Sequence, residues 1–364
     1  MSDVRWMRAA LTLARRGLGQ TWPNPAVGCV VVRDDRVLGR GATGAGGRPH
    51  AEAMALAAAG EASGATVYVT LEPCAHHGRT PPCADALVQA GVARVVCPLQ
   101  DPDPRVSGRG FTRLRDAGIT VDIGCMASEA RALNGGFLSR IERGRPEVLL
   151  KLATTMDGRI AVRTGESRWI TGPAARRRVH LMRAESDAVM IGAGTARTDD
   201  PMLDIRDIGL SDRAPVRIVA DGALSVSLTS RLVRSAKSQP LWLLHRPNVD
   251  RLRAGALSDA GAAPIEVPTH DGTLDVSAVL GELGARGITR LLVEGGGMLA
   301  ASLLAGGLVD RVALFTAGKA IGNDGVPAVQ GFGLDRLSLA PNFTLDRTES
   351  LGGDVLSLWS RTRA

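Results

Sequence analysis

Two stretches of sequence decide how the first part of the chain folds: Pro49-His50-Ala51-Glu52 and, about twenty residues later, Leu71-Glu72-Pro73-Cys74-Ala75-His76-His77-Gly78-Arg79-Thr80-Pro81-Pro82-Cys83. One imidazole and two thiolates form a tetrahedral zinc site whose fourth position is left for water, as is typical of catalytic zinc. The residue types therefore predict a zinc site formed by His50, Cys74 and Cys83.

Glu52 follows His50 by two residues, which is too close for a second zinc ligand on the same helical turn. It is well placed to accept a proton from zinc-bound water, whose pKa falls to about 7. A His-x-Glu box followed by Pro-Cys and a further Cys is typical of zinc deaminases, in which the glutamate transfers protons to the leaving ammonia. Eight residues separate Cys74 from Cys83, whereas the common deaminase pattern has two.

Two other interpretations of these residues remain open. His50 could cap a helix while both cysteines pack as small apolar side chains. Alternatively, His76 or His77 could complete a closed structural zinc site, because structural zinc takes four protein ligands.

The local pattern places the predicted ligands at the ends of regular elements. A helix is expected from Pro49 to Gly60, with His50 and Glu52 in its first turn, and a second from Pro82 to Gly91, with Cys83 in its first turn. The β-branched run 66–71 predicts a buried strand that ends just before Cys74. Strands and helices alternate along residues 1–145, which indicates a mainly parallel sheet covered by helices.

Composition bounds the class of protein. The chain has 364 residues, enough for two domains, and 45% of them are apolar. No run approaches the roughly 18 apolar residues of a membrane span, and the N-terminus lacks a signal-peptide core, so neither a membrane partner nor secretion is expected. Five cysteines at unequal spacing give no disulfide framework, which favours a cytoplasmic location.

The charge pattern indicates which kinds of partner the chain can bind. The net charge is +7, but no basic run occurs and aromatic residues make up only 3% of the chain. A single-stranded nucleic-acid groove needs basic and stacking side chains together. We therefore expect a small phosphorylated molecule as partner and no nucleic acid, with a nucleic-acid base deaminase kept as the rival interpretation.

A polar segment at 141–146 separates the two predicted domains, residues 1–145 and 146–364. Strands are expected in the second domain at 148–153, 187–195, 216–220, 241–244, 265–267 and 290–294, the second of them running into a glycine turn. The last strand leads through Gly295-Gly296-Gly297 into an Ala/Leu-rich helix, a pattern that predicts a phosphate-binding turn. Residues 192–197 resemble a dinucleotide fingerprint, but Arg197 replaces its third glycine, so no Rossmann domain is predicted.

Residues 1 to about 145 resemble the deaminase half of the RibD family of bifunctional riboflavin-biosynthesis enzymes. The resemblance is carried by Pro23-Asn24-Pro25, Val27-Gly28, Pro49 to Glu52, Thr70 to Cys83, Gln100 to Pro104 and Gly108 to Gly110. It implies a cytidine-deaminase-like three-layer α/β/α domain in which His50, Cys74 and Cys83 hold Zn²⁺ and Glu52 is catalytic. It further implies substrate contacts from Asn24, His76, His77 and Arg79. The family usually has a histidine at the position of Thr43, which is a departure in this chain.

The remainder of the chain resembles the reductase half of the same family. The match lies in Lys151-Leu152, Asp157 to Arg159, Gly165 to Thr171, Leu181 to Ala184, Gly194-Thr195, Asp199 to Pro201 and Glu294 to Gly296. This resemblance implies a dihydrofolate-reductase-like α/β domain that uses NADPH. The implied substrate contacts are Ser167, Arg183, Leu203, Arg206 and Glu294. The implied cofactor contacts are Ala153, Trp169, Thr195, Asp199, Gly222, Gly296, Gly297, Met298, Leu299, Ala300, Ala301 and Ser302.

The resemblance predicts two consecutive reactions on one chain. The first is zinc-dependent deamination of 2,5-diamino-6-ribosylamino-4(3H)-pyrimidinone 5′-phosphate, and the second is NADPH-dependent reduction of the ribosyl chain to ribityl. A homo-oligomer is expected. Besides the nucleic-acid deaminase, a monofunctional pyrimidine deaminase with a non-catalytic second domain is the alternative.

Overall fold

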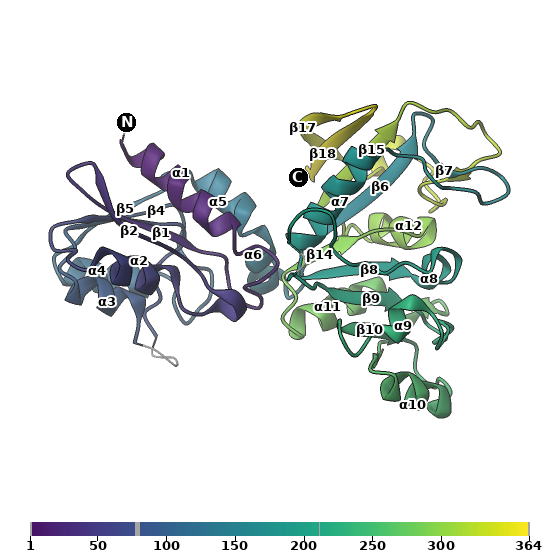
Figure 1. Cartoon of the computed structure of the whole chain (residues 1–364), viewed down its shortest axis with the longest axis horizontal. Helices are drawn as coiled ribbons and strands as arrows, with labels where there is room; N and C mark the ends of the chain where they lie inside the picture. The colour runs from purple at the N-terminus through teal and green to yellow at the C-terminus, as the bar shows by residue number, and fades with distance from the viewer. Residues whose placement is uncertain (1, 77–80, 211, 363–364) are drawn as a thin grey trace. The chain divides into compact units, whose positions relative to one another are not determined.

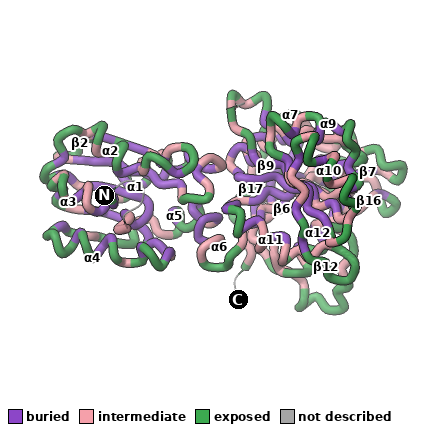
Figure 2. The backbone as a smooth tube through the Cα atoms, turned by 90° about the horizontal axis from the view of Figure 1, so that it is seen from below, coloured by how far each residue is buried: buried purple, intermediate pink, exposed green. Residues whose placement is uncertain are grey.

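The computed structural model describes residues 2–76, 81–210 and 212–362 of the chain. The chain divides into two compact units, Met1–Gly144 and Arg145–Ala364 (Figure 1). Each unit is built around its own sheet, and Figure 2 shows buried backbone gathered along the strands. Among the described residues, no helix has the length and apolar character that crossing a bilayer requires.

The first unit contains a five-stranded sheet. Its strands, in spatial order, are β2 (Arg36–Ala42), β1 (Gly28–Arg33), β3 (Thr66–Val69), β4 (Arg94–Cys97) and β5 (Thr120–Ile123). β3, β4 and β5 are parallel, whereas β1 is antiparallel to both β2 and β3. The predicted parallel sheet is therefore interrupted by one strand, because β1 and β2 form a tight hairpin.

Helices cover both faces of this sheet (Figure 1). They are α1 (Ser2–Arg15), α2 (Ala51–Ala59), α3 (Cys83–Gln89), α4 (Arg109–Asp116), α5 (Ala127–Leu133) and α6 (Gly135–Arg143). Gly28 of β1 lies against α1, since a Cβ there would be 1.9 Å from the Ala10 carbonyl oxygen; Gly41 of β2 lies against α2, where a Cβ would be 2.3 Å from the Ala51 carbonyl oxygen. Gly28 and Gly41 occupy neighbouring register positions, so they face opposite sides of the sheet. The predicted three-layer α/β/α architecture is confirmed.

The second unit contains a nine-stranded sheet. Its strands, in spatial order, are β11 (Ala263–Glu266), β10 (Leu241–His245), β9 (Val216–Ala220), β8 (Ala188–Gly192), β14 (Arg290–Val293), β6 (Glu147–Thr155), β15 (Arg311–Ala317), β18 (Asp354–Arg361) and β17 (Phe343–Leu351). All neighbours from β11 to β15 are parallel, and β18 is antiparallel to both β15 and β17. The result is an α/β domain in which a C-terminal hairpin extends an otherwise parallel sheet.

Smaller elements complete the second unit. Two short ladders pair β7 (Arg159–Ala161) with β16 (Val326–Pro327) and β12 (Thr269–His270) with β13 (Thr273–Leu274). The helices are α7 (Pro173–Ala184), α8 (Ala193–Asp199), α9 (Arg231–Arg234), α10 (Arg251–Asp259), α11 (Val276–Ala285) and α12 (Gly297–Ala305). The core of this unit includes Val189, Ile191, Val219, Leu243 and Phe315, which lie on four strands of the sheet.

One predicted strand was wrong in its second half. The strand expected over 187–195 ends at Gly192, and α8 begins at Ala193. Gly192 is paired with Ala220, the last residue of β9, so no ladder partner remains for the residues that follow. Gly194 and Thr195 therefore lie in a helix and not in a glycine turn.

Candidate active sites

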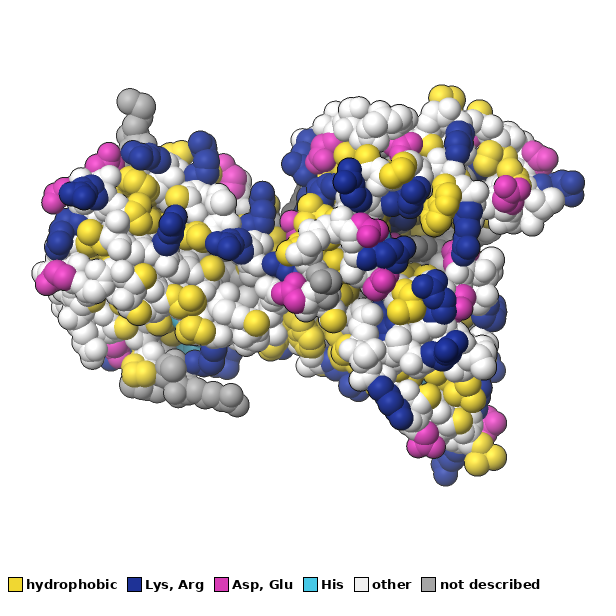
Figure 3. Space-filling view, in the orientation of Figure 1, with side chains coloured by type: hydrophobic (Ala, Val, Ile, Leu, Met, Phe, Trp, Pro, Cys, Tyr) yellow, Lys and Arg dark blue, Asp and Glu magenta, His cyan; other side chains and the backbone are white. Residues whose placement is uncertain are grey.

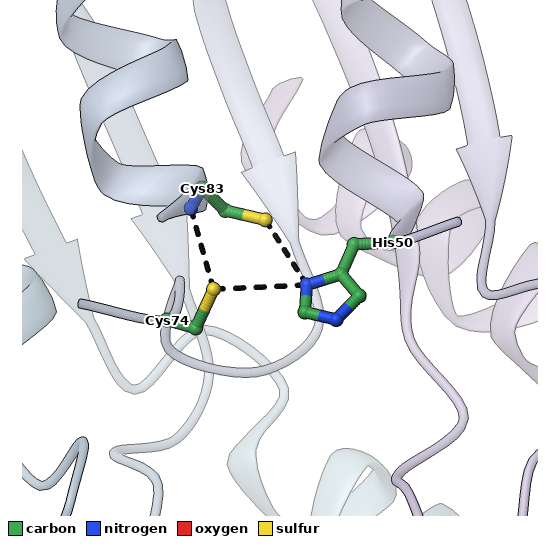
Figure 4. Close-up of side chains that lie close together, drawn as sticks. All are labelled: His50, Cys74 and Cys83. Atoms are coloured by element: carbon green, nitrogen blue, oxygen red, sulfur yellow. Dashed lines mark hydrogen bonds between the residues drawn. The ribbon is translucent and has the colours of Figure 1, made fainter. Parts of the chain in front are cut away.

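His50, Cys74 and Cys83 come together beyond the carboxyl end of β3, the central strand of the first sheet (Figure 4). The Nδ1 atom of His50 lies 3.2 Å from Sγ of Cys83 and 3.6 Å from Sγ of Cys74. The backbone N–H of Cys83 donates to Sγ of Cys74 at 3.3 Å. All three ligand atoms lie within 4.8 Å of one another. Atoms bound at about 2.1 and 2.3 Å to a tetrahedral zinc lie about 3.6 Å apart, so this cluster fits zinc.

Three elements deliver these side chains. His50 is the N-cap of α2, with φ −71° and ψ 153°, so it stands just before the helix and not in its first turn as expected. Cys74 follows β3, and Cys83 is the first residue of α3, in the helical turn predicted for it. Gly60, at φ 65°, ends α2 as predicted, whereas the helix begins at Ala51, two residues later than the expected start at Pro49.

The two thiols form an unequal pair. The Cys83 thiol, the His50 ring and the Cys83 backbone N–H all donate toward Cys74, and together they lower the pKa of Cys74 to about 4 in spite of its burial. The hydrogen bond that the Cys83 thiol donates to Cys74, followed by burial and the charges of Glu52 and Cys74, raises the pKa of Cys83. One sulfur is thus a ready thiolate, and a bound cation would ionise the other.

Glu52 lies in the first turn of α2 with a side chain almost fully buried, 4% exposed. Burial, followed by the charge of Cys74, raises the pKa of Glu52 to about 7. A carboxyl group that titrates near neutral pH can both accept and donate a proton during a reaction. This environment suits the role predicted for Glu52.

The structure also locates the other residues predicted near this site. Asn24 lies in an exposed loop, where its Nδ2 donates to the Gly46 carbonyl oxygen at 3.2 Å. His76 is half-buried, and its Nδ1 atom has no hydrogen-bond partner among the residues that the structure describes. His77 and Arg79 lie outside the described residues. Thr43 stands where the family usually has a histidine. Its hydroxyl accepts a hydrogen bond from the Val27 N–H at 3.0 Å, so this side chain stabilises the neighbouring backbone.

In the second unit, Arg183 of α7 and Glu294, which follows β14, form a buried ion pair. Arg183 donates from Nε to Oε1 at 2.5 Å and from Nη2 to Oε2 at 2.9 Å, while its Nη1 donates to the Asp204 carbonyl oxygen at 2.8 Å. Burial alone would raise the pKa of Glu294, but Arg183 and then Lys151 lower it overall. The structure thus holds Glu294 as a carboxylate.

The segment around Asp204 brings two more predicted residues to this pair. Leu203 is buried, 3% exposed, and has a left-handed backbone at φ 53°. Arg206 is half-exposed and pairs with the Asp204 carboxylate at 2.5 Å. Ser167 lies half-buried in the connection between β7 and α7; among the described residues no hydrogen bond joins it to Arg183.

Lys151 is a further candidate site residue, which was not among the contacts predicted from the sequence. It lies in β6, where burial lowers its pKa and where it is within electrostatic reach of Glu294, Arg183 and Asp199. The available signal was a single charge inside an otherwise apolar strand. Because a charged side chain inside a strand can also point to solvent, that signal alone did not identify the residue.

The triple glycine forms a turn between β14 and α12. Gly295 and Gly296 have positive φ values of 146° and 93°, and Gly297 begins α12. A Cβ on Gly295 would lie 3.5 Å from Oγ1 of Thr195, so the turn lies against α8. Glycines that bring backbone close to a neighbouring helix, followed by the free N–H groups of a new helix, suit a phosphate group. Thr195 and the glycine turn are therefore neighbours in the structure.

The rest of α12 is divided between surface and core. Met298 is 74% exposed, whereas Ala300 and Ala301 are 1% and 5% exposed and pack inside the unit. Ser302 donates from Oγ to the Met298 carbonyl oxygen at 3.1 Å. Because the side chains of Ala300 and Ala301 are buried, the cofactor contacts predicted for these residues would have to be made mainly by backbone atoms.

The remaining predicted cofactor residues lie on separate segments. Trp169 is 61% exposed, with the Arg176 guanidinium 4.5 Å from its ring centre. Arg168 donates from Nη2 to the Asp199 carbonyl oxygen at 3.1 Å, which holds the Trp169 segment beside the end of α8. Half-buried Ala153 is in β6, and Gly222 follows β9.

Two family models match the chain: the cytidine and deoxycytidylate deaminase zinc-binding region over residues 1–99, and the RibD C-terminal domain over residues 146–357. The riboflavin biosynthesis protein RibD of Escherichia coli is 44% identical over 98% of both chains, and that of Aquifex aeolicus is 39% identical over 99% of this chain and 98% of its own.

Solved structures agree with these relatives. Acinetobacter baumannii RibD superposes with a TM-score of 0.89 at 38% identity over 99% of both chains. A diaminohydroxyphosphoribosylaminopyrimidine deaminase/5-amino-6-(5-phosphoribosylamino)uracil reductase from Thermotoga maritima gives 0.87 at 34% identity, again over 99% of both.

Together, the fold, the zinc site and these similarities define a zinc-binding deaminase joined to a reductase. The chain belongs to the RibD family of riboflavin biosynthesis proteins. It is a bifunctional enzyme, which confirms the predicted family and function over the nucleic-acid deaminase and the monofunctional alternative.

Proposed function

We propose that residues 1–145 deaminate 2,5-diamino-6-ribosylamino-4(3H)-pyrimidinone 5′-phosphate and that residues 146–364 then reduce the ribosyl chain with NADPH. The proposed deamination is supported by one observation: the ligand atoms of His50, Cys74 and Cys83 lie together beside the buried carboxyl of Glu52. The relative from Thermotoga maritima, similar over its whole length, is described by the corresponding pair of activities.

His50, Cys74 and Cys83 would hold zinc, which when bound acts as a Lewis acid and activates a water molecule. Glu52 accepts a proton from the attacking water and delivers it to the amino group on C2 of the pyrimidine. A C–O bond forms, the C–N bond breaks, and ammonia leaves. Burial of Glu52 keeps bulk water away from the proton while it is transferred.

Asn24 and His76 are proposed to contact the pyrimidine ribosyl phosphate, and so are His77 and Arg79, which lie outside the described residues. Asn24 stands in an exposed loop, and Nδ1 of His76 is a buried polar atom for which the described part of the chain offers no hydrogen-bond partner. These two positions support a polar substrate.

In the second domain, we propose that NADPH is held by the glycine turn, by the start of α12 and by residues on neighbouring segments. These are Gly296, Gly297 and the first turn of α12, together with Ala153, Trp169, Thr195, Asp199 and Gly222. When bound, NADPH would supply a hydride to C1′ of the ring-opened ribosyl chain. The glycine turn against Thr195 supports this assignment, because it leads into the start of α12, and the first N–H groups of a helix lack partners within the helix and suit a phosphate. We also propose that the nucleotide bound here is NADPH and not another nucleotide.

The two arginines predicted at the substrate are proposed to act differently. Arg183 already donates to Glu294 and to the Asp204 carbonyl oxygen, so its main role is to orient Glu294 toward the ribosyl chain. Arg206 has a half-exposed side chain and is the better phosphate ligand. Ser167 and Leu203 would border the same substrate.

We further propose a cytoplasmic homo-oligomer that binds neither nucleic acid nor membrane. All five cysteines are free. The face drawn in Figure 3 mixes basic with acidic side chains and shows no single basic patch. In the second unit, exposed Leu337 and Leu339 accompany an apolar groove of about 330 Å³ lined by Leu334, Pro341 and Phe343, which suits a second copy of the chain.

A single reaction tests the proposed function. The full-length chain is given the diaminopyrimidine ribosyl phosphate, and ammonia release and NADPH absorbance are followed separately, with a chelator-treated sample beside it. We expect both signals, and loss of ammonia after metal removal. Ammonia without NADPH oxidation would limit the proposal to the first domain, and ammonia that survives complete metal removal would contradict the zinc mechanism.

A further inference from the structure

Glu72 is a buried acid of the first unit to which the deamination steps assign no role. It lies three residues beyond the end of β3, and its side chain is almost fully enclosed, with 4% of the residue exposed. A buried carboxylate is costly unless hydrogen-bond donors surround it. Four backbone N–H groups donate to its two oxygens: those of Asp101 at 3.1 Å and Gly108 at 3.0 Å to Oε2, and those of Gly110 at 2.9 Å and Phe111 at 3.4 Å to Oε1.

Two of these donors belong to the first turn of α4. The N-cap residue of α4, Gly108, has a left-handed backbone at φ 78° and offers no side chain as a cap. The first N–H groups of a helix lack partners within the helix. Glu72 supplies the missing acceptor from a distant segment, and the positive end of the helix dipole favours its negative charge.

Helix α4, which Glu72 caps, packs closely against the segment that contains Cys74. A Cβ at Gly110 would lie 2.1 Å from the carbonyl oxygen of Pro73, so only a glycine lets α4 approach the backbone this closely. Pro73 stands between Glu72 and Cys74 in the sequence. The carboxylate on one side and the close contact on the other therefore fix the path of the chain into Cys74.

The second cysteine is tied to the same helix. Asp85 of α3 forms an ion pair with Arg113 of α4. At the start of α3, the N–H of Cys83 donates to Sγ of Cys74, and the N–H of Ala84 donates to the Cys74 carbonyl oxygen at 3.1 Å. Both cysteine segments are therefore anchored on α4.

We propose that Glu72 is a positioning residue for the zinc site: by capping α4 and holding it against Pro73, it keeps the sulfur atoms of Cys74 and Cys83 at the separation that zinc requires. Glu72 itself touches neither the metal nor the substrate. The inference rests on the proposed ligand set His50, Cys74 and Cys83. Removal of carboxylates that act behind metal ligands typically lowers metal affinity by about 10- to 100-fold.

Glu72→Gln is the informative substitution. It preserves size but replaces one acceptor oxygen by an NH₂ group, which cannot accept and would face two N–H donors. The full-length, zinc-loaded variant should transfer zinc to a colorimetric chelator about tenfold or more faster than the unaltered chain. After cobalt replaces zinc, its sulfur-to-cobalt absorption should also shift. Normal reductase activity of the same chain would report that the second unit folds, and unfolding of the first unit in urea would report whether that unit folds and how stable it is.

The matched control is Arg94→Met, which disturbs the first unit at a place remote from the ligands. Arg94 begins β4, and it donates to Asp3 at 2.8 and 2.9 Å and to Asp122 at 2.6 Å. This variant should lower the stability of the unit without changing the cobalt spectrum. If Glu72→Gln released zinc no faster than Arg94→Met at equal stability, or if its cobalt spectrum were unaltered, the proposal would be overturned.

A second variant covers the case in which Glu72→Gln yields no folded chain. Gly110→Ala keeps the carboxylate and strains the same contact with Pro73, and it must also release zinc faster; unchanged release would overturn the proposal. Failure of the ligand set would look different. A Cys74→Ser chain that kept its zinc would contradict the proposed function, whatever Glu72→Gln does.

Discussion

The backbone N–H of Cys83, in the first turn of α3, donates to Sγ of Cys74 at 3.3 Å (Figure 4). Two of the three proposed zinc ligands are thus joined directly by a hydrogen bond. An N–H at a helix start favours a thiolate, because the helix dipole adds to the hydrogen bond. Pro81 and Pro82 come directly before Cys83, and their rings restrict the backbone where the chain enters α3.

Replacement of either cysteine should empty the metal site. Cys74→Ser or Cys83→Ser should reduce zinc from about one ion per chain to a small fraction, since two protein ligands hold zinc weakly. Metal content by atomic emission and ammonia release should fall together, with reduction of the deaminated substrate retained. Cys125→Ser, at a half-buried cysteine outside the cluster, serves as control. Full zinc content in Cys83→Ser would exclude that residue as a ligand.

Glu52→Gln should separate metal binding from proton transfer. The amide keeps the size of the side chain but cannot accept a proton, so ammonia release should fall by about 10²- to 10⁴-fold while zinc content stays unchanged. The comparison is Glu129→Gln, an exposed glutamate of the same unit, which should behave like the unaltered chain. An undiminished rate in Glu52→Gln would remove Glu52 from the reaction.

Arg206→Ala should weaken binding of the phosphorylated substrate to the reductase. Loss of one charge-assisted hydrogen bond, worth about 1.5–3 kcal/mol, should raise the reductase KM about ten- to hundredfold. The effect on kcat should be small, because the phosphate is remote from C1′. Arg251→Ala, at an exposed arginine of α10, is the matched control. A KM equal to that of the unaltered chain would show that Arg206 does not bind the phosphate.

Asp187 should make stability depend on pH. Its buried carboxylate accepts from the N–H and hydroxyl of Thr289 and from the N–H of Arg290. Burial raises the pKa of Asp187 against these bonds, so the fold favours the protonated form. The stabilisation is therefore complete below the ordinary aspartate pKa near 4 and is lost as pH rises through the folded-state value.

Asp187→Asn retains an acceptor oxygen and cannot ionise. Its free energy of unfolding, measured in urea from pH 4 to pH 8, should rise relative to that of the unaltered chain as pH increases. Asp259→Asn, at an exposed residue of α10, should show a difference that does not depend on pH. A pH-independent difference for Asp187→Asn would mean that this group does not titrate as proposed.

Elements with strong local signals could be predicted from the sequence. The proline and glycine that bound α2, the proline before Cys83 and the β-branched run of β9 each specify a local conformation, and the structure has these elements where they were expected. The metal cluster could be predicted for the same reason, because only a few residue types bind zinc and all of them lie beside clear element ends.

Features that depend on distant partners could not be predicted. β8 ends at Gly192 because β9 ends at Ala220, and no local pattern at 192–195 contains that information. The hairpin of β17 and β18 was not identified: most residues of β17 are exposed, so this strand lacks the alternation that marks a half-buried strand. Likewise, Arg183 and Glu294 lie 111 residues apart, and only the folded sheet makes them a pair.

The central claim is that one chain contains two independent active sites. The most direct test compares Glu52→Gln with Glu294→Gln in full-length protein, each supplied in turn with the diaminopyrimidine substrate and with its deaminated product. We expect Glu52→Gln to release no ammonia yet to oxidise NADPH with the deaminated product, and Glu294→Gln to release ammonia normally yet to reduce slowly. If either substitution abolished both activities in a chain that remains folded, the assignment of one reaction to each unit would be contradicted.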